Sequence, residues 1–148
     1  MMTPFPHQYE ITLSHVGPST GEVDAPPRPP LFTAPPPELG GPDDRWSPEQ
    51  LLLSALAGCL LATFQALAAR DHLVATAWTA HASARLDRGS QGLELSGFRL
   101  EVNVTVPDGD VARAEGLLAR AKRHCVVANA LRLPVELVAT VVSAGPRH

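Results

Sequence analysis

The longest apolar run in this sequence is residues 48–70, PEQLLLSALAGCLLATFQALAAR, and it carries Cys59 near its middle. Its length and composition predict a helix of about 34 Å. Ser47 suits the N-cap, Pro48 suits the first helical position, and Gln50 completes a capping box with Ser47. The rest of the chain must therefore cover a long apolar helix that holds a thiol.

The two faces of this predicted helix differ. Bulky side chains fall on one face: Leu53, Leu56, Leu60, Phe64 and Leu67. Small or polar side chains fall on the other, with Cys59 at its edge: Ser54, Ala55, Gly58, Ala62, Gln65, Ala66 and Ala69. A bulky face packs against a sheet, whereas a small face lets a second backbone come close. Because both faces are apolar, we expect a dimer whose interface passes near Cys59.

A membrane-spanning helix is the alternative for the same run. Leu51 to Ala69 holds no charged residue, which satisfies the length requirement of a span. The run is rich in alanine, however, and contains polar residues such as Thr63 and Gln65. No basic cluster flanks it on one side, as the positive-inside rule would require. The sequence therefore favours a buried helix.

Length and composition predict one globular domain over residues 1–148, with N-terminal strands and a proline-rich loop in 1–46 and the core in 47–148. The formal charge of −3 gives no reason to expect nucleic acid or an anionic membrane as a partner. The first ten residues lack the features of a signal peptide, so a cytoplasmic protein with reduced thiols is expected. The cysteines and histidines show no metal-ligand spacing, so neither metal nor cofactor is expected.

Periodicity predicts six strands and two further helical segments around the long helix. The strands are Tyr9–His15, Gly21–Val23, Leu31–Thr33, Val74–Asp87, Leu93–Val106 and Pro134–Ser143, and the helical segments are Val111–His124 and Val126–Leu131. The expected inward rows are Val74, Trp78, Ala80, Ala82, Ala84 and Leu86, then Phe98, Leu100, Val102, Val104 and Val106, and the helical stripe Ala114, Leu117, Leu118 and Ala121. The last strand is nearly all apolar, which predicts a buried sheet position. Residues 145–148 are expected to form a tail.

The two cysteines, Cys59 and Cys125, leave two interpretations open. Both are compatible with small buried hydrophobic residues. Alternatively, one thiolate attacks a peroxide and becomes a sulfenic acid, and the other thiol condenses with it. The second interpretation needs the two sulfurs close in space and a cationic neighbour. His124 precedes Cys125 and could supply that charge, although a surface position at a helix end also suits it.

Three segments together resemble the osmotically inducible protein C and organic hydroperoxide resistance (OsmC/Ohr) family. They are SPEQLLLSALAGC at Ser47–Cys59, PPPELGGP at Pro35–Pro42, and ARAKRHCVVANAL at Ala119–Leu131 followed by PVEL. The resemblance extends from about Leu31 to the end of the chain. It implies an α+β fold in which antiparallel sheets wrap a long central helix. It also implies an intertwined homodimer with active sites at the interface.

The same resemblance implies a thiol peroxidase that reduces organic hydroperoxides and is regenerated by a dithiol of lipoyl type. By it, Cys59 is the peroxidatic cysteine, Cys125 the resolving cysteine, and Glu49 the carboxylate that engages an active-site arginine. The family supplies this arginine from its N-terminal sheet or loop, which leaves Arg28 and Arg45 as candidates here.

The chain departs from the family pattern after its second cysteine. Cys125 is followed by Val126 and not by the family's proline, and Ala128 replaces a serine. These departures keep a second hypothesis open, namely a non-catalytic small-molecule binder with an apolar pocket at the dimer interface. A structural or membrane-associated protein built on the apolar helix is the third.

Overall fold

The structure is a computed structural model that describes residues 2–145. Met1 and residues 146–148, most of the predicted tail, lie outside the described residues. The chain divides between Leu51 and Leu52 into two compact units, which we describe separately.

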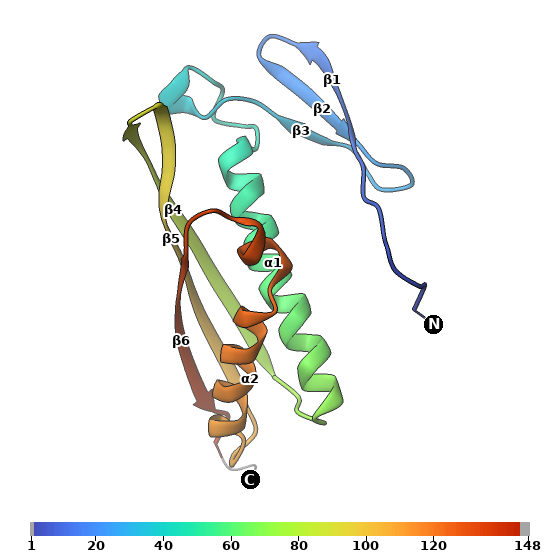
Figure 1. Ribbon diagram of the computed structural model, residues 1–148, viewed down its shortest axis with the longest axis vertical. Coiled ribbons are helices and arrows are strands. Elements are labelled where there is room, and N and C mark those ends of the chain that lie inside the picture. The colour runs from blue at the N-terminus through green and yellow to red at the C-terminus, as the bar shows by residue number, and fades with distance from the viewer. Residues whose placement is uncertain (1, 146–148) are drawn as a thin grey trace. The chain divides into compact units, whose positions relative to one another are not determined.

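In chain order the elements are β1 Thr12–Gly17, β2 Thr20–Asp24, β3 Leu31–Thr33, the 3-10 turn η1 Pro37–Leu39, α1 Pro48–Arg70, β4 Ala77–Gly89, β5 Gly92–Val106, α2 Val111–Arg123, α3 Val126–Ala130 and β6 Val135–Ser143 (Figure 1).

The first unit contains a three-stranded antiparallel sheet in the order β1-β2-β3. The predicted first strand began at Tyr9, but β1 begins at Thr12, which pairs with Asp24. Beyond Asp24 the chain enters Pro26 and Pro27, which have no amide proton to donate and cannot extend the ladder. The small N-terminal sheet expected from the sequence is therefore present, with a later start.

The start of α1 follows the predicted capping box. The Ser47 backbone N–H donates to Gln50 Oε1 at 3.0 Å, and the Gln50 backbone N–H donates to Ser47 Oγ at 3.1 Å. Each side chain thus satisfies an amide that the first turn of a helix leaves unpaired. The helix begins at Pro48 and ends at Arg70, as the sequence predicts.

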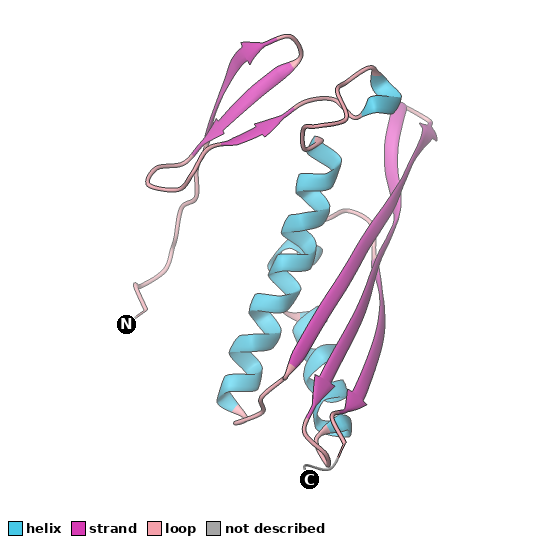
Figure 2. Cartoon of the chain, turned by 180° about the vertical axis from the view of Figure 1, so that it is seen from behind, coloured by secondary structure: helices cyan, strands magenta, loops and turns pink. Residues whose placement is uncertain are grey.

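The second unit places helices α1 and α2 on one face of a sheet in the order β4-β5-β6 (Figure 2). Strands β4 and β5 are antiparallel, but β6 runs parallel to β5. The α+β fold expected from the sequence is confirmed, but this sheet is mixed and not antiparallel throughout. The reason is that α2 and α3 form a crossover connection, which brings the chain back in the same direction.

The position predicted for β6 is also wrong. Its run of apolar residues predicted a buried strand, yet β6 is an edge strand of the sheet. Val135 at its start is buried, whereas Val142 is 48% exposed. Arg99 on β5 donates to both carboxylate oxygens of Glu136 on β6 at 3.3 Å. This exposed ion pair joins residues that are partners in the parallel register.

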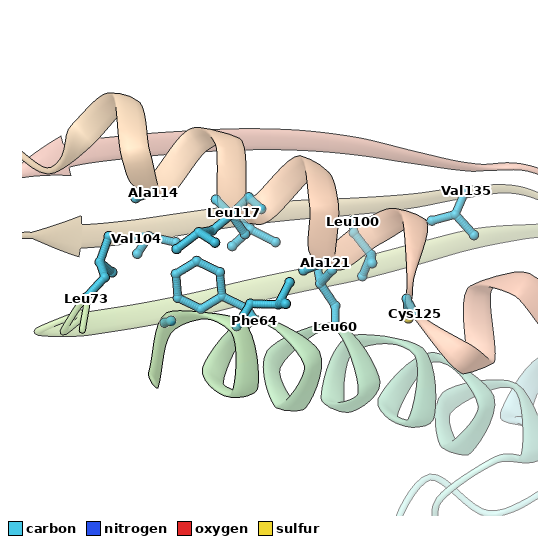
Figure 3. Close-up of a cluster of buried hydrophobic side chains, with 14 of the residues drawn as sticks. Leu60, Phe64, Leu73, Leu100, Val104, Ala114, Leu117, Ala121, Cys125 and Val135 are labelled. Atoms are coloured by element: carbon cyan, nitrogen blue, oxygen red, sulfur yellow. The ribbon is translucent and has the colours of Figure 1, made fainter. Parts of the chain in front are cut away.

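The core of the second unit lies between α1, α2 and the sheet (Figure 3). Most of the side chains predicted for it are buried: Leu56, Leu60, Phe64 and Leu67 of α1, all five of the β5 row, and all four of the α2 stripe. The Phe64 ring packs against Trp78 of β4, with ring centroids 5.0 Å apart. Leu53, which the helical period also assigns to this face, is half-buried. Periodicity thus identified the core positions of α1, β5 and α2 correctly.

The inward row predicted for β4 is partly wrong. Val74 precedes the strand and is 66% exposed, while its neighbour Leu73 is buried. The register of β4 against β5 shifts between Ser83 and Arg85. A bulge of this kind changes which face a side chain occupies, and Leu86 beyond it is exposed.

Helix α1 is buried on one face only in this chain. Every residue of its predicted small face is exposed: Ser54, Ala55, Gly58, Ala62, Gln65, Ala66 and Ala69. By length and composition the helix could also cross a membrane, and 28% of its most apolar window is buried. The expectation of a fully buried central helix is therefore not met within one chain.

Candidate active site

The two cysteines are 66 positions apart in sequence, and the fold of the second unit brings their thiols into contact. Cys59 lies in the middle of α1 and is half-buried. Cys125 is the N-cap of α3 and is 1% exposed. The Cys59 side chain interacts directly with the Cys125 thiol. In Figure 3, Cys125 lies among the buried apolar side chains between α1 and the end of α2.

The surroundings of Cys125 favour its neutral form. Burial raises the pKa of the Cys125 thiol above its ordinary value, because a thiolate loses its hydration there. The neighbouring Cys59 raises that pKa further, and the backbone at Ala128 and Val127 opposes the shift. Cys125 is therefore protonated at neutral pH, which suits a thiol that reacts second and not one that attacks first.

Backbone hydrogen bonds hold Cys125 in the turn between α2 and α3. Its N–H donates to the Lys122 carbonyl at 3.3 Å, and its own carbonyl accepts from the Asn129 N–H at 3.0 Å. The Asn129 side chain donates to the Arg123 carbonyl at 3.0 Å, which closes the turn. His124 is exposed at the end of α2, which agrees with the surface position that was one of its two interpretations.

Glu49 lies in the first turn of α1, within the first unit. It lines a cavity of about 300 Å³ together with loop and strand residues such as Leu13, Ser19 and Pro36. The Glu49 Oε2 atom is buried and has no hydrogen-bond partner among the residues that the structure describes. Thr33 Oγ1 lines the same cavity and is also buried without a partner. Such atoms need an explanation, because buried polar atoms in proteins almost always have a hydrogen-bond partner.

The two candidate arginines make other contacts. Arg28 donates to the Ala25 carbonyl at 3.5 Å. Arg45 forms an exposed ion pair with Asp44 at 3.4 Å, and its guanidinium carbon lies 5.6 Å from the centre of the Phe32 ring. Neither arginine bonds to Glu49. The structure therefore brings Cys59 and Cys125 together but pairs no arginine with Glu49 in residues 2–145.

Thr33 is the residue of this region that sequence reasoning missed. It lies at the end of the short strand β3 and is 8% exposed. A single threonine in an edge strand carries no signal of a site, because its importance comes from what packs around its hydroxyl. Over the described residues 2–145, no group of three histidine, cysteine or acidic side chains is placed to hold a metal ion.

Comparison with known protein families gives a match to the model described as "OsmC-like protein" over residues 41–139, more than half of the chain. The chain belongs to the OsmC/Ohr family. The matched region contains Glu49 and both cysteines. No curated protein matches the chain at a significant level.

Solved structures show the same fold at low sequence identity. An OsmC-like protein of Vibrio cholerae has a TM-score of 0.79 at 15% identity, over 92% of this chain and 99% of that one. An organic hydroperoxide resistance protein of Elizabethkingia anophelis has 0.70 at 22%, over 95% and 100%. One from Legionella pneumophila has 0.70 at 24%, over 94% and 100%. The first of these is described as a protein of unknown function, so the shared fold does not by itself assign an activity.

Proposed function

We propose that this OsmC/Ohr family member is a thiol-dependent peroxidase that reduces organic hydroperoxides. The Cys59 thiolate attacks the O–O bond, which breaks to give a Cys59 sulfenic acid and an alcohol. The Cys125 thiol then condenses with the sulfenic acid, which forms the Cys59–Cys125 disulfide and releases water. A dithiol supplies two electrons to reduce the disulfide and is itself oxidised to a disulfide.

The observation that carries this proposal is the contact between a half-exposed thiol and a buried one. Cys59 is accessible enough to meet a substrate, whereas Cys125 is 1% exposed and is held next to it. A sulfenic acid at Cys59 would meet the Cys125 thiol without a large rearrangement. Two inert core cysteines need no such pairing, and both would be expected to be buried.

We propose further that the working form is a homodimer. Glu49 and Cys59 are ten positions apart along α1, a rise of about 15 Å that a glutamate side chain does not span. Glu49 therefore needs another group to act on a reaction at Cys59. The exposed small face of α1 is where a second chain could approach closely and supply a missing cation.

The deciding experiment compares wild type with Cys59→Ser and Cys125→Ser. Consumption of cumene hydroperoxide is followed with excess dithiothreitol as reductant. Cys59→Ser should lose activity, whereas Cys125→Ser should turn over more slowly and accumulate the sulfenic acid. Peroxide consumption by Cys59→Ser at the wild-type rate would refute the proposal.

A second candidate function is supported by the unpaired Glu49. Its buried Oε2 has no hydrogen-bond partner within residues 2–145, and both Arg28 and Arg45 make other contacts. An OsmC-like protein without the activating arginine could bind a small molecule and leave it unchanged. In that case Cys59 would react with a thiol probe no faster than a model peptide, and peroxide would produce no Cys59–Cys125 disulfide.

A further inference from the structure

The chain is positively charged around Cys125 although it is acidic as a whole. Residues 116–135 contain no aspartate or glutamate. They contain four of the twelve lysines and arginines: Arg120, Lys122, Arg123 and Arg132. The local charge is therefore opposite in sign to the formal net charge of −3, which favours the approach of an anion at this end of α2.

A polar pocket of about 370 Å³ lies within this region, in the second unit. Lys122, Asn129 and Arg132 contribute its polar side chains, and Leu131 and Val135 are among its apolar ones. Lys122 is half-buried and Arg132 is exposed. Two cationic side chains thus line one small pocket.

Neither cation of this pocket has an ion-pair partner within residues 2–145. Among the described residues, the ion pairs involve other side chains, and no carboxylate lies within salt-bridge distance of Lys122 or Arg132. The nearest acid in sequence, Glu136, is bonded to Arg99. Two unpaired cations with an amide beside them form a suitable site for a carboxylate, phosphate or sulfonate group.

The pocket is connected to Cys125 through the backbone. The Lys122 carbonyl accepts from the Cys125 N–H, and the Asn129 N–H donates to the Cys125 carbonyl. Asn129 is four residues from Cys125, one helical turn or about 5.4 Å along the axis. An anion held by Lys122 and Arg132 is therefore placed close to the turn that carries the second thiol.

We propose that this pocket binds the negatively charged group of the reductant that reopens the Cys59–Cys125 disulfide. The inference rests on the proposed function, and it gives the reductant a chemical class: a small dithiol that carries an anionic group. One thiolate of the reductant attacks a protein sulfur, and the protein disulfide breaks to a mixed disulfide and a thiol. A thiolate of a second reductant molecule then attacks the mixed disulfide, so that the two reductant molecules leave joined by a disulfide and two protein thiols are restored.

The test uses two dithiols that differ in charge. The anionic reductant is 2,3-dimercaptopropanesulfonate, and the neutral one is 2,3-dimercaptopropanol. The pocket variant is Lys122→Gln/Arg132→Gln. The control Arg88→Gln/Arg113→Gln removes the same charge from exposed positions on β4 and α2 that do not line the pocket. Second-order rates of disulfide reduction are measured at low ionic strength.

For each protein, the rate with the anionic dithiol is divided by the rate with the neutral one. This ratio should be equal in wild type and the control, and about tenfold lower in the pocket variant. Reduction by the neutral dithiol should be unchanged in all three proteins, which shows that the pocket variant is folded. Intrinsic differences between the two reductants cancel, because only the ratio is compared between proteins. An equal ratio in wild type and the pocket variant would overturn the inference.

The disulfide for this measurement is formed with diamide and confirmed by mass spectrometry, so the result does not depend on peroxidase activity. Failure to consume hydroperoxide with 2,3-dimercaptopropanol as reductant would count against the proposed function. The ratio measured on the diamide-formed disulfide would still decide whether the pocket recognises an anionic dithiol. The two failures are therefore distinguishable.

Discussion

The thiol of Cys125 contacts that of Cys59 and is far less exposed to solvent. This asymmetry predicts an order of reaction. One equivalent of cumene hydroperoxide should remove both free thiols from wild type and produce one intramolecular disulfide. Cys125→Ser should stop at a Cys59 sulfenic acid that dimedone traps, and Cys59→Ser should keep its thiol. Intact-protein mass spectrometry measures each product, and dimedone labelling at Cys125 in the Cys59→Ser protein would contradict the assigned order.

The raised pKa of Cys125 also predicts how stability changes with pH. The folded state holds the Cys125 proton more tightly than the unfolded chain does. Its contribution to the free energy of unfolding is therefore complete below the ordinary cysteine pKa and is lost as pH rises toward the folded pKa. The slope from one group reaches at most about 1.4 kcal/mol per pH unit. Urea unfolding between pH 7 and pH 10 should show this decline in wild type, and Cys125→Ala should show a smaller one.

The reciprocal hydrogen bonds between Ser47 and Gln50 predict a capping effect on stability. Ser47→Ala should lower the free energy of unfolding by about 1 kcal/mol, because it leaves an amide of the first turn without its side-chain acceptor. The double variant Ser47→Ala/Gln50→Ala should cost less than the sum of the single variants, since both remove parts of one motif. Ser14→Ala, at an exposed position in β1, is the control and should be close to neutral.

The exposed small face of α1 predicts the position of the dimer interface. A Cβ added at Gly58 meets no atom within 4 Å in this chain. Gly58→Leu should therefore leave the monomer fold intact and weaken dimerisation by keeping the second backbone away. Sedimentation measures the dimer, and circular dichroism confirms the fold. An unchanged dimer would place the interface elsewhere.

The geometry of the loop before α1 predicts that Gly41 tolerates no side chain. A Cβ at Gly41 would overlap the Pro35 carbonyl oxygen, and the Gly41 N–H donates to the Pro36 carbonyl at 3.1 Å. Gly41→Ala should therefore destabilise the chain by about 1–3 kcal/mol through overpacking. The control Gly17→Ala lies in β1, where an added Cβ meets nothing within 4 Å. Equal stability of the two variants would show that the loop relaxes at no cost.

Local patterns in the sequence account for most of the elements and for the core. The helix limits at Pro48 and Arg70, its cap and its bulky face follow from residues that are neighbours in sequence or one turn apart. The buried row of β5 follows from alternation in the same way. Each of these features depends on short-range geometry, which repeats with a fixed period.

Predictions failed where the outcome depended on partners distant in sequence. The late start of β1, the parallel and edge position of β6, and the shift at Ser83 are properties of strand pairing. The unpaired Thr33 and the two cations at Lys122 and Arg132 are likewise defined by what packs around them. No period in the sequence records such neighbours.

The helix of residues 48–70 shows both what the sequence predicts and what it does not. The sequence by itself determined that it is a capped, two-faced helix with a thiol between its faces. The tertiary structure alone decided that Cys59 contacts Cys125, that one face of the helix stays open in a single chain, and that no arginine within residues 2–145 bonds to Glu49. The physical reason is the separation in sequence of the residues involved. Caps and helix faces arise from residues a few positions apart, whereas contacts between thiols and between charges join segments that come together only on folding.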